Sequence, residues 1–214
     1  MNKLIIVGAG GFGREALQWA LQSNDNNVKW KIVGFVSDNL DILQGKNCAF
    51  PILGRALSWQ PKSDERFVIA IANPKHKEML VDILTTKGAI FENIIHRTAI
   101  LFPTTKLGQG VILCPHVIVS DSVVIGNHVM INNNSCIGHD TYVGDYTTIN
   151  SLCDITGNVS VGKGVFISSS VNVTPRCNIG DHAYICAGSV VVNNIRQNTR
   201  VFGVPARKFE IKTT

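Results

Sequence analysis

A histidine and an aspartate stand side by side at residues 139 and 140, and this pair is the first place where the sequence could perform chemistry. An imidazole titrates near neutral pH and commonly takes a proton from an attacking amine or hydroxyl. A neighbouring carboxylate is able to orient the ring. Gly157 follows His139 by eighteen residues, and its amide could donate to an oxyanion if the two residues stack. Acyl transfer needs such groups; an ordinary exposed polar corner is the alternative.

A glycine pattern near the N-terminus points to phosphate binding. The segment GAGGFG at residues 8–13 matches G-x-G-x-x-G, with a strand pattern before it and a helix pattern after it. Glycines let a phosphate approach the backbone, and a helix N-terminus offers free N–H groups. Asp38, at the end of the next strand, is placed to accept hydrogen bonds from a ribose or base. Tight strand–helix packing without a ligand is the alternative.

The glycine segment belongs to a predicted βαβαβ unit, a Rossmann-like half. Its strands are predicted at Lys3–Val7, Lys31–Val36 and Phe67–Ile71, with one helix after Arg14 and another at Lys75–Thr86. A dinucleotide site uses two such halves, and only one fits before residue 93. The sequence therefore favours binding of the mononucleotide end of a ligand over binding of NAD, and this argues against an oxidoreductase.

The residues after 93 carry a repeat of six. Seventeen positions, taken every sixth residue from Ile95 to Val191, are all Leu, Ile or Val. Neither a helical period nor plain alternation predicts this pattern. Each hexad is expected to form one short strand and one corner, and three hexads to close a coil of eighteen residues. Coils stack about 4.8 Å apart, so residues eighteen apart become neighbours.

Three secondary expectations follow from the repeat. Small or polar residues follow most of the aliphatic positions, as at Gly138, and are typical of the backbone angles of a sharp corner. Asn132 and Asn150 are expected to stack as a ladder. His128 shares its hexad phase with two other histidines and is expected to face outward in mid-strand. A purely structural solenoid and a γ-class carbonic anhydrase are alternatives for the repeat.

Composition excludes several other classes. The 214 residues are 45% apolar and 16% charged, which does not fit a disordered chain. The net charge of +5 is scattered without a run of four Lys or Arg, so nucleic-acid binding is not expected. No stretch of 18 apolar residues predicts a membrane span. Six cysteines without a C-x-x-C pairing favour reduced thiols in the cytoplasm. The histidines lack the close pairing of a zinc site, so no metal is predicted.

The repeat resembles the left-handed parallel β-helix of hexapeptide-repeat acyltransferases, and residues 202–207, FGVPAR, are similar to the ending common in them. Together with the N-terminal half, essentially the whole chain resembles the sialic acid O-acetyltransferase family, which includes N-acetyltransferases of nucleotide-linked amino sugars. The segments GAGGFGRE, VIAIAN, NIIHRTAI, IGHDTYVGDY, GNVSVGKGVFI and VFGVPAR carry the resemblance. It implies a nucleotide-sugar domain at 1–92, an acetyltransferase domain with a C-terminal tail at 93–214, acetyl-CoA as donor, and a homotrimer with active sites between neighbouring prisms.

The resemblance also assigns roles residue by residue. It makes His139 the general base and Asp140 its orienter, and it places Asn132 near the acceptor. The nucleotide-sugar site is implied at Gly10, Gly11, Phe12, Ser37, Asp38 and Ala72. The acetyl-CoA contacts are implied at Thr148, Ser169 and Ala187, whereas the oxyanion donor at Gly157 is expected from the coil spacing. Thr148 replaces a family histidine, which leaves open whether its side chain contacts the thioester. Phe12 replaces another histidine, Ala72 a glycine and Ser37-Asp38 a pair of acids, so nucleotide recognition is expected to differ from that of the UDP-sugar enzymes.

The sequence thus predicts transfer of acetyl from acetyl-CoA to the amino group of a nucleotide-linked amino sugar, in surface polysaccharide or glycan synthesis. Two alternatives stay open. One is O-acetylation of sialic acid or a related sugar by the same residues. The other is a trimer that binds a nucleotide sugar without catalysis.

Overall fold

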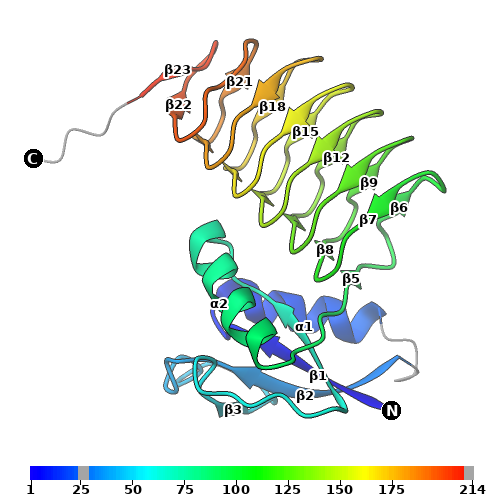
Figure 1. Ribbon diagram of the computed structural model, residues 1–214, viewed down its shortest axis with the longest axis vertical. Coiled ribbons are helices and arrows are strands. Elements are labelled where there is room, and N and C mark those ends of the chain that lie inside the picture. The colour runs from blue at the N-terminus through cyan, green and yellow to red at the C-terminus, as the bar shows by residue number, and fades with distance from the viewer. Residues whose placement is uncertain (24–28, 210–214) are drawn as a thin grey trace, which may run out of the picture.

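A computed structural model describes residues 1–23 and 29–209. The N-terminal part is a four-stranded parallel sheet in the order β3-β2-β1-β4, with helices α1 and α2 (Figure 1). The predicted tail beyond residue 209 lies outside the described residues. The bounds of these elements are β1 (Asn2–Val7), α1 (Gly11–Ser23), β2 (Trp30–Val36), β3 (Ile52–Gly54), β4 (Glu65–Ile69) and α2 (Pro74–Thr86).

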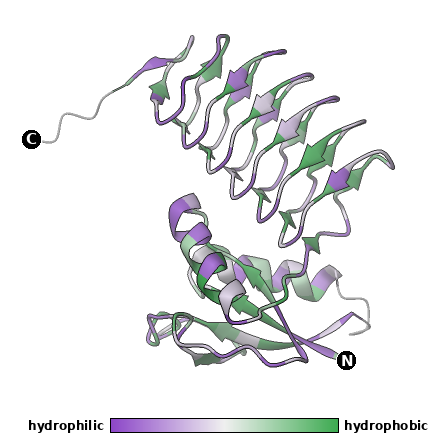
Figure 2. Cartoon of the chain, in the orientation of Figure 1, coloured by the Kyte–Doolittle hydropathy of each residue, from purple (hydrophilic) through white to green (hydrophobic). Residues whose placement is uncertain are grey.

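The order of elements departs from βαβαβ at one crossover. Between β2 and β4 the chain forms loops and the short strand β3, where the predicted unit has a helix. Residues 38–64 contain Pro51 and Pro61, several Asn and Asp residues, and Gly45 and Gly54, which disfavour a helix. Strand β1 is buried over its last four residues, and Figure 2 shows hydrophobic strands at the centre of this sheet.

The rest of the chain is the predicted left-handed parallel β-helix, whose coils rise away from the N-terminal part (Figure 1). Its first face, nearest α2, holds β5 (Ile94–Ile95), β8 (Ile112–Leu113), β11 (Met130–Ile131), β14 (Thr148–Ile149), β17 (Phe166–Ile167), β20 (Tyr184–Ile185), β22 (Arg200–Phe202) and β23 (Arg207–Lys208).

The other two faces follow in the same order around each coil. The second face holds β6 (Ile100–Leu101), β9 (Ile118–Val119), β12 (Cys136–Ile137), β15 (Asp154–Ile155), β18 (Asn172–Val173) and β21 (Val190–Val191). The third face holds β7 (Lys106–Leu107), β10 (Val124–Ile125), β13 (Tyr142–Val143), β16 (Ser160–Val161) and β19 (Asn178–Ile179).

The coil length is eighteen residues, as predicted. Ile137 pairs with Ile155 and Ile131 with Ile149, each in parallel register. The inward aliphatic residues are fully or almost fully buried from Leu113 to Val191, and they form one hydrophobic cluster with residues of the N-terminal sheet. The predicted boundary at 92/93 stays a prediction, because this shared cluster spans both parts.

The corners correct two expectations. The left-handed backbone angles fall three residues after the aliphatic position, as at Asp140 with φ 56°, and not on the glycine directly after it. That glycine is required for another reason: a Cβ on Gly138 would lie 2.6 Å from the backbone N of Gly157 in the next coil. His128 also lies at a corner, not in mid-strand, and it is only 2% exposed.

Candidate functional site

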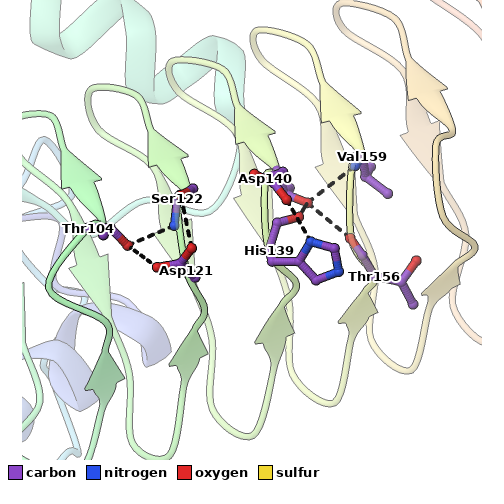
Figure 3. A network of polar contacts seen from close by, with 8 residues as sticks. Thr104, Asp121, Ser122, His139, Asp140, Thr156 and Val159 are labelled. Atoms are coloured by element: carbon purple, nitrogen blue, oxygen red, sulfur yellow. Dashed lines mark hydrogen bonds and ion pairs between the residues drawn. The ribbon is translucent and has the colours of Figure 1, made fainter.

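His139 and Asp140 lie at the corner between β12 and β13, on the surface of the prism (Figure 3). His139 Nδ1 is 2.7 Å from Asp140 Oδ2, and the two side chains are 61% and 55% exposed. An ionised carboxylate only accepts hydrogen bonds, so Nδ1 carries the proton and donates it. Nε2 is left with its lone pair, which is the form that a general base needs. The structure therefore brings the predicted pair into contact.

Gly157 lies directly against the imidazole, one coil further along. A Cβ on Gly157 would lie 2.5 Å from His139 Nε2 and 2.7 Å from Cε1, so only a glycine leaves room for the ring. Among the residues that the structure describes, none accepts a hydrogen bond from the Gly157 N–H. A base nitrogen and a free amide donor thus share one small surface, which suits attack on a carbonyl carbon.

A third polar group on this edge was missed by the sequence reasoning. Asp121 lies one coil before His139, and its carboxylate accepts hydrogen bonds from Thr104 Oγ1 at 2.6 Å and Ser122 Oγ at 3.0 Å (Figure 3). These bonds lower the pKa of the Asp121 carboxyl, and the nearby His139 acts in the same direction. Its spacing of eighteen residues from His139 is the signal that would have found it.

A separate cavity of about 490 Å³ lies at the carboxyl ends of the N-terminal strands. Sheet order reverses beside β1, and open parallel sheets bind ligands at such a point. All six residues predicted for the nucleotide sugar line this cavity: Gly10, Gly11, Phe12, Ser37, Asp38 and Ala72. The structure therefore places these six residues around one cavity.

The glycines of the cavity divide into two kinds. A Cβ on Gly10 or Gly11 would meet nothing within 4 Å, so their backbone is open to a ligand. A Cβ on Gly13 would lie 2.0 Å from the carbonyl oxygen of Gly8, so Gly13 serves the close packing of α1 on β1. The predicted alternative of packing without a ligand explains Gly13, but it gives no reason for two glycines that face open space.

Two features of the cavity wall bear on recognition. Asp38 Oδ1 accepts a hydrogen bond from the Leu57 N–H at 3.2 Å, which leaves Oδ2 for a ligand. His76, on the first turn of α2, also lines the cavity, although no role was predicted for it. The signal was Asn73-Pro74, a cap that begins the helix next to Ala72; the Asn73 side chain accepts from the His76 N–H.

Thr148 requires a correction. Its side chain is fully buried between the β-helix and α2, where Oγ1 donates to the Ala72 carbonyl oxygen at 2.8 Å and accepts from Lys77 Nζ at 2.9 Å. A fully buried hydroxyl with both partners inside the chain cannot touch a coenzyme. The predicted acetyl-CoA contact at Thr148 is therefore wrong, because the helix that covers this face was not anticipated there.

The remaining predicted residues lie on another edge of the prism. Asn132, Ser169 and Ala187 follow strands of the first face, whereas His139 and Gly157 follow strands of the second. The register of Ile131 on Ile149 stacks Asn132 and Asn150 as expected, but no hydrogen bond joins their side chains, which bond to the Asn133 N–H and to the Ile167 carbonyl oxygen. Ser169 and Ala187 are exposed. Within one chain, the width of a face separates these three residues from the base.

Neither a metal site nor a membrane-spanning helix is found in the described ranges. No three His, Cys, Asp or Glu side chains there are grouped to hold a metal ion. Neither α1 nor α2 has the length and apolar character that would let it cross a membrane.

A left-handed β-helix with an exposed His–Asp pair, joined to a sheet with a ligand cavity, defines a hexapeptide-repeat acyltransferase. The family model of the PglD N-terminal domain matches residues 3–84. A GDP-perosamine N-acetyltransferase of Escherichia coli O157:H7 is 30% identical over 207 residues, which are 95% of this chain and 84% of that protein. The chain belongs to the family of nucleotide-amino-sugar N-acetyltransferases, as the sequence predicted.

Solved structures agree on the fold over the whole length. The acetyltransferase domain of PglB from Neisseria gonorrhoeae FA1090 superposes with a TM-score of 0.89 at 22% identity, covering 98% of this chain and 100% of that one. WeeI from Acinetobacter baumannii AYE gives 0.86 at 25% identity, with 98% and 100% covered. PerB from Caulobacter crescentus, solved with CoA and GDP-perosamine, gives 0.88 at 24% identity, with 98% of each chain covered.

Proposed function

We propose that this protein transfers the acetyl group of acetyl-CoA to the amino group of a nucleotide-linked amino sugar. The observation that carries the proposal is the contact of His139 with both Asp140 and Gly157, which joins an oriented base to a free amide donor. The activity in the names of two relatives, N-acetylation of GDP-perosamine, is the same kind of reaction.

The proposed reaction is a direct transfer. As the amine nitrogen attacks the thioester carbon, His139 Nε2 takes its proton, and Asp140 stabilises the imidazolium that forms. The Gly157 N–H donates to the oxyanion of the tetrahedral intermediate. The carbon–sulfur bond then breaks, and the imidazolium returns the proton to the departing thiolate of CoA. The products are an amide and free CoA, and the base is restored.

The cavity of the N-terminal part is proposed to hold the nucleotide end of the acceptor. Gly10 and Gly11 expose backbone where phosphates can approach, at the N-terminus of α1. The free oxygen of Asp38 is available to a base or ribose. GDP-perosamine is the first acceptor to test, because two relatives carry it in their names or titles.

The assembly and location belong to the same proposal. Asn132, Ser169 and Ala187 lie on a different edge from His139, so a site that uses both edges needs two neighbouring prisms, as in a homotrimer. Exposed apolar residues on the outer faces, such as Ile118, Val124 and Tyr142, are suited to such contacts. Free cysteines favour a reducing compartment, and we place the enzyme in the cytoplasm.

A thiol-release assay with acetyl-CoA tests the function. GDP-, UDP- and dTDP-linked 4-amino sugars are offered beside matched 4-hydroxy sugars and sialic acid. Release of CoA with the amino sugars, abolished in His139→Ala, supports the proposal. Turnover only with hydroxyl acceptors would replace it with O-acetylation. Tight nucleotide-sugar binding without any turnover would replace it with a binding trimer.

A further inference from the structure

Lys77 is the most buried cation in the described part of the chain, and the reaction above makes no use of it. It lies on α2 with only 1% of its surface exposed, in line with the apolar residues Leu80 and Leu84 of the same helix. Burial lowers the pKa of the Lys77 amine from 10.5 to about 7. A methionine or leucine would fill such a place without the cost of removing an amine from water.

The amine has acceptors on the β-helix only. Lys77 Nζ donates to the carbonyl oxygen of His128 at 3.0 Å and to Thr148 Oγ1 at 2.9 Å, and it lies 3.4 Å from the carbonyl oxygen of Thr147. No carboxylate is among these partners. Because the partners are neutral, the main effect of these bonds is on geometry. They fix one point of α2 on two adjacent coils, at the corner that holds His128 and at strand β14.

The same contacts continue to the wall of the nucleotide-sugar cavity. Thr148 Oγ1, which accepts from Lys77, donates in turn to the carbonyl oxygen of Ala72 at 2.8 Å. Ala72 lines the cavity, and so does His76, which directly precedes Lys77. The segment of cavity wall between β4 and α2 is thus bonded to the β-helix near both of its ends, at Ala72 and at Lys77, through the hydroxyl of Thr148.

We propose that Lys77, acting through Thr148 and Ala72, is a positioning residue that holds the acceptor cavity in register with the β-helix. It touches neither substrate, and its effect is on where the nucleotide end is presented. This inference rests on the proposed function, because it assumes that the acceptor occupies the cavity.

The sharpest test removes the Thr148 hydroxyl, the middle group of this chain of hydrogen bonds, with the least change of side-chain shape. Thr148→Val loses both hydrogen bonds, whereas Thr148→Ser keeps the hydroxyl. Thr147→Val is the matched control, because that buried hydroxyl bonds only to Gly162 and Val165 inside the β-helix. We expect Thr148→Val to raise the KM for the acceptor about tenfold, with the KM for acetyl-CoA unchanged, and Thr148→Ser to restore it. Thr147→Val should alter the thermal midpoint only.

Lys77→Met gives a second, independent measurement, with the exposed Lys75→Met as its control. Acceptor affinity measured by calorimetry should fall in Lys77→Met and stay unchanged in Lys75→Met. The proposal would be overturned if the acceptor KM were unchanged in Thr148→Val and the acceptor affinity were unchanged in Lys77→Met. It would also be overturned if Thr148→Val and Thr147→Val raised the acceptor KM equally. Failure of the wild-type protein to bind any nucleotide sugar would instead overturn the proposed function.

Discussion

Substitution of Gly157 by alanine should displace the imidazole of His139 while leaving the base itself unchanged. The added Cβ would lie 2.5 Å from His139 Nε2 in the present arrangement, whereas ordinary contacts begin at about 3.5 Å. Gly157 is not among the residues with positive φ, so its backbone accepts alanine. The alanine also keeps the N–H proposed for the oxyanion. The imidazole is then the group that must move, by about 1 Å.

The structure sets the size of the effect. A misplacement of about 1 Å can cost roughly 10²-fold in rate, so kcat should fall about 100-fold. Stability should change by no more than about 1 kcal/mol, because the displaced ring is mostly exposed and free to swing outward. The KM for both substrates should stay near the wild-type value, since the clash involves the base alone.

The assay is CoA release by Gly157→Ala, His139→Ala and the double variant, with thermal midpoints measured in parallel. If Gly157→Ala acts through the ring, the double variant should be no slower than His139→Ala. A Gly157→Ala enzyme with more than about half of the wild-type kcat would refute the reasoning. Losses that multiply in the double variant would show that Gly157 acts independently of His139.

Three further predictions follow from the same geometry. Pro175→Asp should place a carboxylate where it can accept from the Gly157 N–H, and lower kcat about 100-fold without changing the KM, while Pro175→Ala stays active; equal activity of both would contradict the role of that N–H. Asp38→Ala should raise the acceptor KM about tenfold and leave acetyl-CoA kinetics unchanged; the reverse pattern would contradict the cavity assignment. Between pH 7 and 9 the unfolding free energy of the wild-type protein should rise by about 1.4 kcal/mol per pH unit relative to that of Lys77→Met, because the unfolded Lys77 amine keeps a proton that the folded one loses above about pH 7. Equal changes of unfolding free energy with pH in the two proteins, measured by denaturant unfolding, would contradict this prediction.

The β-helix could be predicted because its repeat encodes its own geometry. Each coil of eighteen residues repeats the same inward aliphatic positions, so the neighbours of His139 follow from counting alone. This is why Gly157 could be placed beside the ring from the sequence. Asp121 obeys the same rule, because it precedes His139 by eighteen residues just as Gly157 follows it.

The contact between the two parts could not be predicted in this way. Nothing in the hexads indicates which face is covered by α2, so Thr148 was expected to be accessible and is buried. Lys77 stands in the apolar stripe of its helix, where a periodicity argument assigns no role to a charge. Long-range packing between a helix and a repeat depends on how they dock, and the local pattern of neither one records it.

The catalytic corner differs from the corner after the third face by what it lacks. At the corner after the third face, an Asp or Asn side chain two positions after the aliphatic residue accepts from the backbone N–H one coil earlier, as Asp145 does from Asn127 and Asp181 from Lys163. The residues one and two coils after His139, eighteen and thirty-six positions along the sequence, are Gly157 and Pro175. Neither has a side chain that can accept a hydrogen bond. The glycine gives the imidazole its space, and the proline leaves the glycine amide free. At this corner an unoccupied amide and a side chain that can act as a base come together because no acceptor follows at positions 157 and 175, and counting by eighteen finds that pattern in the sequence.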